Sequence, residues 1–164
     1  MRLYILLILF TYCSFFNCNS QTSQEDEEKT RTKINMIYDK NSSECSSGVD
    51  IVTDFNGKDE FWNICNLENG NRIIQIESHK ANTFFQEIYF EKDGELIYAL
   101  ETEKYMPKNK FTQMIWSCEF YANNGKLISL ISLGHGKTED DEWNPEIIFD
   151  MYKNRISEIK KMER

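Results

Sequence analysis

The stretch YFEKDGELI at residues 89–97 places the pair Asp93-Gly94 between two runs of β-forming residues. An Asp-Gly or Asn-Gly pair in that position is a strong signal for a two-residue hairpin turn. The pattern returns at residues 120–128 as FYANNGKLI, and Asn-Gly pairs also occur at Asn56-Gly57 and Asn69-Gly70. Four turns of one kind therefore predict a run of antiparallel hairpins.

Counting outward from each turn predicts which strand residues lie opposite one another. The expected pairs are Val52 with Phe61, Cys65 with Ile74, Phe90 with Ile97, Tyr89 with Tyr98, and Tyr121 with Ile128. Apolar residues fall on both faces of the resulting sheet. Such a sheet is expected to have helix on one face, and to curl around itself or meet a partner with the other.

The segments on either side of the strands predict helices. Ile34, Ile37 and Tyr38 have helical spacing before the first strand, and Asn144-Pro145 is typical of a helix start. Apolar residues then recur at helical spacing at Ile148, Met151, Tyr152, Ile156 and Ile159. The predicted fold class is α+β: an antiparallel β-meander of six to eight strands with a short N-terminal helix and a C-terminal helix packed on the sheet.

Composition limits the classes of function. A chain of 164 residues with 40% hydrophobic residues has enough apolar material for one core, and two domains would each be marginal. The excess of 27 acidic over 19 basic residues gives a net charge of −8. This charge opposes a sequence-independent grip on phosphate backbones, so we expect no nucleic-acid partner.

The N-terminus predicts the compartment. Arg2 precedes an apolar run at residues 3–10, and polarity begins abruptly at Asn17. This layout is typical of a signal peptide and is short for a membrane-spanning helix. We therefore expect a signal peptide at residues 1–17, a polar acidic tether at residues 18–32 and a single domain at residues 33–164. The tether and the domain are expected to lie in an extracytoplasmic space.

The end of that segment, FFNC at residues 15–18, resembles a bacterial lipobox, although Phe15 and Asn17 depart from the usual residues. The resemblance implies lipid attachment at Cys18 and a membrane anchor. The acidic run EDEE at residues 25–28 is similar to tethers of lipoproteins on the outer face of the Gram-negative outer membrane. The alternative is ordinary cleavage after Ser20, which gives a soluble periplasmic or secreted protein.

The repeated hairpin motif resembles small exported proteins and lipoproteins of Gram-negative bacteria. This resemblance implies a fold and brings no activity with it.

Cys45, Cys65 and Cys118 remain in the predicted domain. One disulfide and one free thiol is the simplest outcome for three cysteines outside the cytoplasm, and sequence leaves the pairing open. The alternative is that all three are buried and reduced.

Few residues suggest chemistry. No sequence spacing pairs His79 or His135 with a nucleophile or carboxylate as a catalytic site would require. The acidic residues 139–142 lack the spacing of a calcium loop. We therefore predict no catalytic residue, metal ligand or cofactor. Tyr89, Tyr98 and Trp116 are candidates for partner-facing aromatics, although for the tryptophan a place in the core is the favoured alternative, because large aromatic side chains usually supply core area.

Three hypotheses for function follow. The first is a non-enzymatic binding protein for an unknown envelope or extracellular partner or ligand, tethered to the membrane if Cys18 is lipidated. The second is an inhibitor or immunity-like protein that plugs a basic cleft of a hydrolase or toxin. The third is an enzyme whose site is assembled only by folding.

Overall fold

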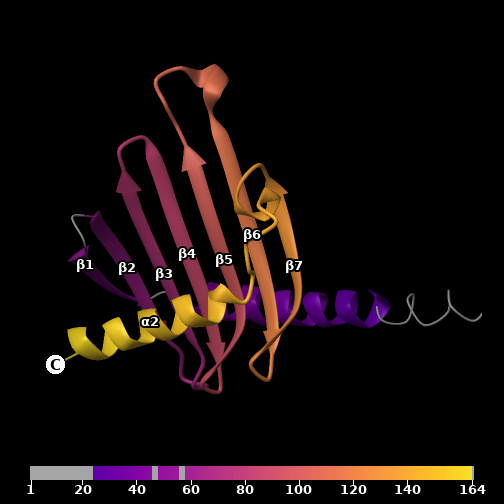
Figure 1. Ribbon diagram of the computed structural model, residues 1–164. Coiled ribbons are helices and arrows are strands. Elements are labelled where there is room, and N and C mark those ends of the chain that lie inside the picture. Colours follow the sequence, from indigo (N-terminus) through magenta and orange to yellow (C-terminus); the bar gives the residue numbers. More distant parts are fainter. Residues whose placement is uncertain (1–23, 46–47, 56–57, 164) are drawn as a thin grey trace, which may run out of the picture.

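A computed structural model of the chain describes residues 24–45, 48–55 and 58–163, and it contains a seven-stranded antiparallel sheet whose strands lie in chain order (Figure 1). The strands are β1 (Val49–Phe55), β2 (Lys58–Asn66), β3 (Arg72–Lys80), β4 (Thr83–Lys92), β5 (Glu95–Tyr105), β6 (Met114–Asn123) and β7 (Lys126–Gly134). Short 3-10 turns, Lys110–Thr112 and Lys137–Glu139, follow β5 and β7. This arrangement confirms the predicted meander.

Two helices pack on opposite faces of the sheet: α1, at residues 24–44, and α2, Ile147–Met162 (Figure 1). Their presence confirms the α+β class. α1 includes residues 24–32, which the sequence predicts to be part of the tether, whereas residues 1–23, with Cys18, lie outside the described residues. Among the described residues, neither helix combines the length and the apolar character that a membrane span requires.

Each face of the sheet has its own core, because side chains alternate between the faces along every strand. The core between α2 and the sheet consists of Trp62, Ile64, Ile74, Ile76, Tyr89, Leu96, Ala99, Trp116, Cys118 and Phe120 from the strands with Ile148 and Ile159 from the helix. Beneath α1 they are Ile34, Cys65, Ile73, Ile88, Phe90, Tyr98 and Tyr121. The expectation of helix on one face only is therefore wrong. α1 nevertheless leaves part of its face open, because Phe61 and Leu133 are 51% and 67% exposed there.

The two repeated hairpins share a turn and an irregularity. Asp93 and Asn124 have φ angles of 53° and 52°, and a glycine with positive φ follows each, as a two-residue hairpin turn requires. The ladder then shifts by one residue, between Phe90 and Glu91 in one hairpin and between Tyr121 and Ala122 in the other. A β-bulge after each predicted turn thus changes the register beyond it.

The bulges make three of the predicted pairs wrong. Phe90 lies opposite Tyr98, Tyr89 opposite Ala99, and Tyr121 opposite Ser129. An extra residue in the second strand, Ile97 in the first hairpin, has no partner in the ladder and moves every later residue by one place. Tyr89 and Tyr98 therefore belong to the cores on opposite faces.

The loop at Asn69-Gly70 is longer than two residues, so the predicted pairing of Cys65 with Ile74 is also wrong. Cys65 lies opposite Ile73. The buried side chain of Asn41 on α1 accepts hydrogen bonds from the side-chain amides of Asn69 and Asn71, at 3.1 and 2.9 Å. A contact with the helix thus stabilises the longer loop. The pairing of Val52 with Phe61 is confirmed, although the turn Asn56-Gly57 itself lies outside the described residues.

A disulfide joins Cys45, just after α1, to Cys65 on β2, with 5.9 Å between the Cα atoms. It fixes the end of α1 to the face of the sheet that the helix covers. Cys118 is free and buried beneath the other face. Burial raises the pKa of the Cys118 thiol to about 12, so this thiol stays protonated and has low reactivity.

Candidate functional site

The three aromatic residues proposed as partner-facing lie in the core. Tyr89, Tyr98 and Trp116 are 1%, 4% and 2% exposed. The indole N–H of Trp116 donates to the hydroxyls of Ser132 and Thr138, both at 3.1 Å. These side chains supply packing beneath the helices, which for Trp116 is the alternative that the sequence favoured.

Both histidines are exposed. His79 packs against the ring of Phe84, with 5.1 Å between the ring centroids. His135 is exposed, and its Nδ1 lies 2.5 Å from a carboxylate oxygen of Glu139. Within the described ranges, no group of three or more His, Cys, Asp or Glu side chains is arranged to hold a metal ion.

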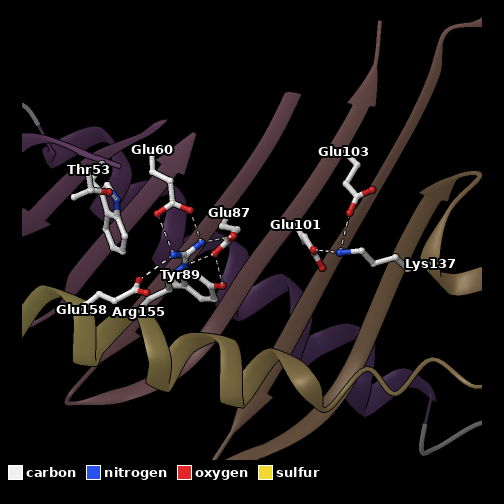
Figure 2. A network of polar contacts seen from close by, with 10 residues as sticks. Thr53, Glu60, Glu87, Tyr89, Glu101, Glu103, Lys137, Arg155 and Glu158 are labelled. Atoms are coloured by element: carbon white, nitrogen blue, oxygen red, sulfur yellow. Dashed lines mark hydrogen bonds and ion pairs between the residues drawn. The ribbon is translucent and has the colours of Figure 1, made fainter. Parts of the chain in front are cut away.

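The most elaborate polar network lies between α2 and the sheet and is centred on Arg155 (Figure 2). The guanidinium donates to Glu87 on β4 through Nε and Nη2, both at 2.8 Å, and to Glu60 on β2 at 3.1 and 3.2 Å. Glu158, one helical turn along α2, is the third carboxylate that accepts from the guanidinium, at 2.9 Å. The Arg155 Cζ also lies 5.2 Å from the centroid of the Trp62 ring.

The network favours the ionised form of the Glu87 carboxylate. Burial alone would raise the pKa of Glu87, but the hydrogen bonds and charge of Arg155, the Tyr89 hydroxyl and the charge of Lys58 outweigh it and place the pKa below its ordinary value. The carboxylates of Glu60 and Glu87 are committed to Arg155, so they serve to fix α2 on the sheet.

The lowered pKa of Glu87 predicts a pH-dependent contribution to stability. A carboxylate whose pKa is lower in the folded state stabilises the protein above pH 4.5, its ordinary pKa, and this contribution is lost as the pH falls through the folded-state value. Glu87→Gln should lower the free energy of unfolding by about 2 kcal/mol at neutral pH. In urea titrations between pH 3 and 7, this difference should shrink below pH 4.5.

Glu95, which is exposed at the start of β5, supplies the matched control for that titration. Glu95→Gln should change stability by less than about 0.5 kcal/mol at every pH. A deficit for Glu87→Gln that stays constant from pH 7 to pH 3 would show that ionisation of Glu87 does not contribute.

A second buried cluster lies beside the first on the same face. Glu101 on β5 is directly opposite Glu87, and Lys137 bonds to Glu101 and, at 2.8 Å, to Glu103 (Figure 2). Burial raises the pKa of Glu101 above its ordinary value, and the charges of Glu87 and Glu103 add to the rise against the opposing effect of Lys137. In this cluster too the carboxylates bond to a cation of the protein itself, a lysine from the segment after β7.

The opposite face carries a different site, at the end of the sheet that α1 leaves open. Val52 on β1 and Phe61 on β2 lie opposite one another there and are 65% and 51% exposed. A hollow of about 370 Å³ between β1, β2 and β3 surrounds them. Its lining is Asp50, Ile51, Val52, Phe61, Trp62, Asn63, Gln75 and Glu77. We call this site the acidic hollow.

Carboxylates surround the two apolar residues of the acidic hollow. Asp54 and Asp59 lie opposite one another next to Val52 and Phe61, and Asp50 and Glu77 line the hollow itself. Asp50 accepts a hydrogen bond from Asn63 at 2.8 Å, and Glu77 accepts from Gln75 and Gln86 at 2.8 and 3.0 Å. In the described part of the chain, none of these four carboxylates forms a salt bridge.

The sequence contains a pattern for this site that pairing residues outward from the turns does not reveal. Every second residue of β1 belongs to one set, Asp50, Val52 and Asp54, and the same spacing in β2 gives Asp59, Phe61 and Asn63. Because side chains alternate between the two faces of a sheet, each set lies on one face. Such an arrangement can hold a basic group beside an apolar contact.

Comparison of the chain with protein-family models, with curated proteins and with solved structures found no match in any of the three.

Proposed function

We propose that this protein is an exported, non-enzymatic binding protein that docks a basic partner protein at the acidic hollow. The observation that carries the proposal is the exposed pair Val52 and Phe61 within four carboxylates that form no salt bridge among the described residues. Interface hot spots commonly combine an aromatic anchor with surrounding polar groups. The charges select the partner, because a basic surface complements an acidic one.

The shape of the hollow favours a lysine or arginine side chain from the partner. The carboxylates of Asp50 and Glu77 can pair with the cationic head, while the ring of Phe61 offers its face to the same group. The walls are three paired strands, so little chain has to be ordered on binding. Preorganisation of this kind favours affinity.

The proposed location follows from the N-terminus. A signal peptide at residues 1–17 and lipid at Cys18 would tether the domain to the outer membrane, whereas cleavage after Ser20 would leave it soluble outside the cytoplasm. The disulfide between Cys45 and Cys65 supports an oxidising compartment. Either form leaves the acidic hollow available to an extracytoplasmic partner.

An inhibitor or immunity-like role is the second candidate, and it uses the same surface. The acidic character of the hollow favours it, because a basic active-site cleft of a hydrolase or toxin has the complementary charge. The two roles differ in the partner's fate: an inhibitor abolishes the partner's enzymatic activity on binding, whereas a simple binding protein leaves it unchanged.

Phe61→Ala tests the proposed contact. We expect it to weaken capture of the partner from native envelopes by about 30-fold in Kd, which corresponds to about 2 kcal/mol for loss of an aromatic hot spot. Phe111→Ala is the matched control, since Phe111 is 98% exposed on the loop after β5. The measurement is quantitative pull-down with the full chain as bait, followed by titration with the purified partner.

Salt distinguishes the proposed contact from adventitious adhesion. Binding should weaken as ionic strength rises, because exposed charge pairs are screened within about 10 Å at 0.1 M salt. A partner captured equally by both alanine variants, or one with an acidic binding surface, would refute the assignment of the hollow.

A further inference from the structure

A second pocket lies on the other face of the same strands, between α2 and the ends of β2, β3 and β4. Its volume is about 580 Å³, within the range of pockets that hold small molecules. Three lysines contribute to its wall: Lys58 at the start of β2, Lys80 at the end of β3 and Lys161 near the end of α2. We call it the lysine pocket.

The carboxylates of the lysine pocket are already engaged. Glu60, Glu87 and Glu158 all line it, and all three accept hydrogen bonds from Arg155 at distances between 2.8 and 3.2 Å. The side chains of Glu60 and Glu87 are only 3% and 14% exposed. Arg155 balances one of these three negative charges, so two remain for the lysines of the pocket to offset.

The lysines, by contrast, keep their ammonium groups available. Within the part of the chain that the structure describes, none of the three forms a salt bridge. Lys58 instead places its Nζ 4.4 Å from the centroid of the Phe85 ring, and its charge acts on Glu87 without a direct ion pair. Lys80 and Lys161 are exposed at the mouth of the pocket.

This concentration of cations runs against the charge of the whole chain. The protein has 27 acidic and 19 basic residues, yet the pocket lining has four cations and three carboxylates. The lining as a whole therefore carries one net positive charge, in a chain whose net charge is −8. Such a pocket attracts anions and repels cations.

We propose that the lysine pocket binds a small molecule that carries two or more anionic groups, either carboxylates or phosphates. Lysine ammonium groups bind such groups as point charges with three donors each. The neutral side chains of Asn154 and Ser157 add hydrogen-bonding capacity, and Met151 provides an apolar wall. This site lies on the face opposite the acidic hollow and does not depend on the proposed docking of a partner.

The test uses the protein expressed from its full sequence and two probes, pyrophosphate and citrate, titrated by calorimetry at low salt. The variant with Lys58→Gln, Lys80→Gln and Lys161→Gln should bind the preferred probe at least about tenfold more weakly than the wild type. A control variant with Lys92→Gln, Lys108→Gln and Lys126→Gln removes the same charge from exposed positions outside the pocket and should bind within about twofold of the wild type. Comparison of the two probes distinguishes phosphate from carboxylate recognition.

Chemical-shift mapping on the wild type provides a readout that does not depend on the variants. The preferred probe should perturb amides of residues 151–161 and the adjoining ends of β2 and β3. Failure of both probes to bind, equal weakening in the two triple variants, or perturbations confined to other regions would each overturn the proposal.

Discussion

Arg155→Met is expected to lower the free energy of unfolding by about 3–5 kcal/mol, because it leaves the buried carboxylates of Glu60 and Glu87 without their cation. Methionine keeps most of the apolar volume of the arginine stem, so the loss reflects mainly the uncompensated charge. Urea denaturation at neutral pH measures the change. A loss of this size is a large fraction of the 5–15 kcal/mol that typically stabilises a domain.

The matched control is Lys153→Met on the same helix. Lys153 pairs with Asp150 at 3.3 Å, but both side chains are more than 70% exposed, so this change should stay within about 0.5 kcal/mol. Adding Glu60→Gln and Glu87→Gln to Arg155→Met should recover part of the loss, since it removes the unpaired charges. Equal effects of the two methionine substitutions would mean that the Arg155 network does not hold α2 on the sheet.

Removal of the disulfide should have the second largest effect. Cys45→Ala with Cys65→Ala is expected to cost about 2–4 kcal/mol, because the bond constrains a loop with a sequence separation of 20 in the unfolded chain. The bond also holds the end of α1 against the core that contains Phe90 and Tyr98. Thermal unfolding of the variant and the wild type, with and without reductant, measures the effect.

Reductant supplies the internal control for this prediction. It should lower the melting temperature of the wild type to that of the double variant and leave the variant itself unchanged. Because Cys118 is buried and its thiol stays protonated, alkylation of the folded protein should not reach it. A wild-type melting temperature that does not respond to complete reduction would contradict the stabilising role of the bond.

The two proposed sites share strands and differ in charge because of the alternation of side chains. Asp59 and Phe61 on β2 face the acidic hollow, whereas Lys58 and Glu60 face the lysine pocket. A shift of one residue in this strand would exchange the two sets of side chains. Register therefore decides which face offers which chemistry.

The sequence by itself determined the fold class. Asp93-Gly94 and Asn124-Gly125 form turns because these residues adopt positive φ at low cost, which is a local property of the chain. The alternation of Asp50, Val52 and Asp54 is likewise local and holds in the strand. The helical spacing of apolar residues that ends at Ile159 is a local property too, and it correctly predicts α2.

Only the tertiary structure decided the register beyond each turn, the cysteine pairing and the partners of Arg155. Isoleucine is an ordinary strand residue, so nothing in its type marks Ile97 as the bulged position. The longer loop at Asn69 depends on a hydrogen bond to Asn41, 28 residues earlier. Arg155 meets carboxylates 68 and 95 residues away. Turns and amphipathic patterns depend on near neighbours, whereas these contacts exist only once the two helices have packed on the sheet.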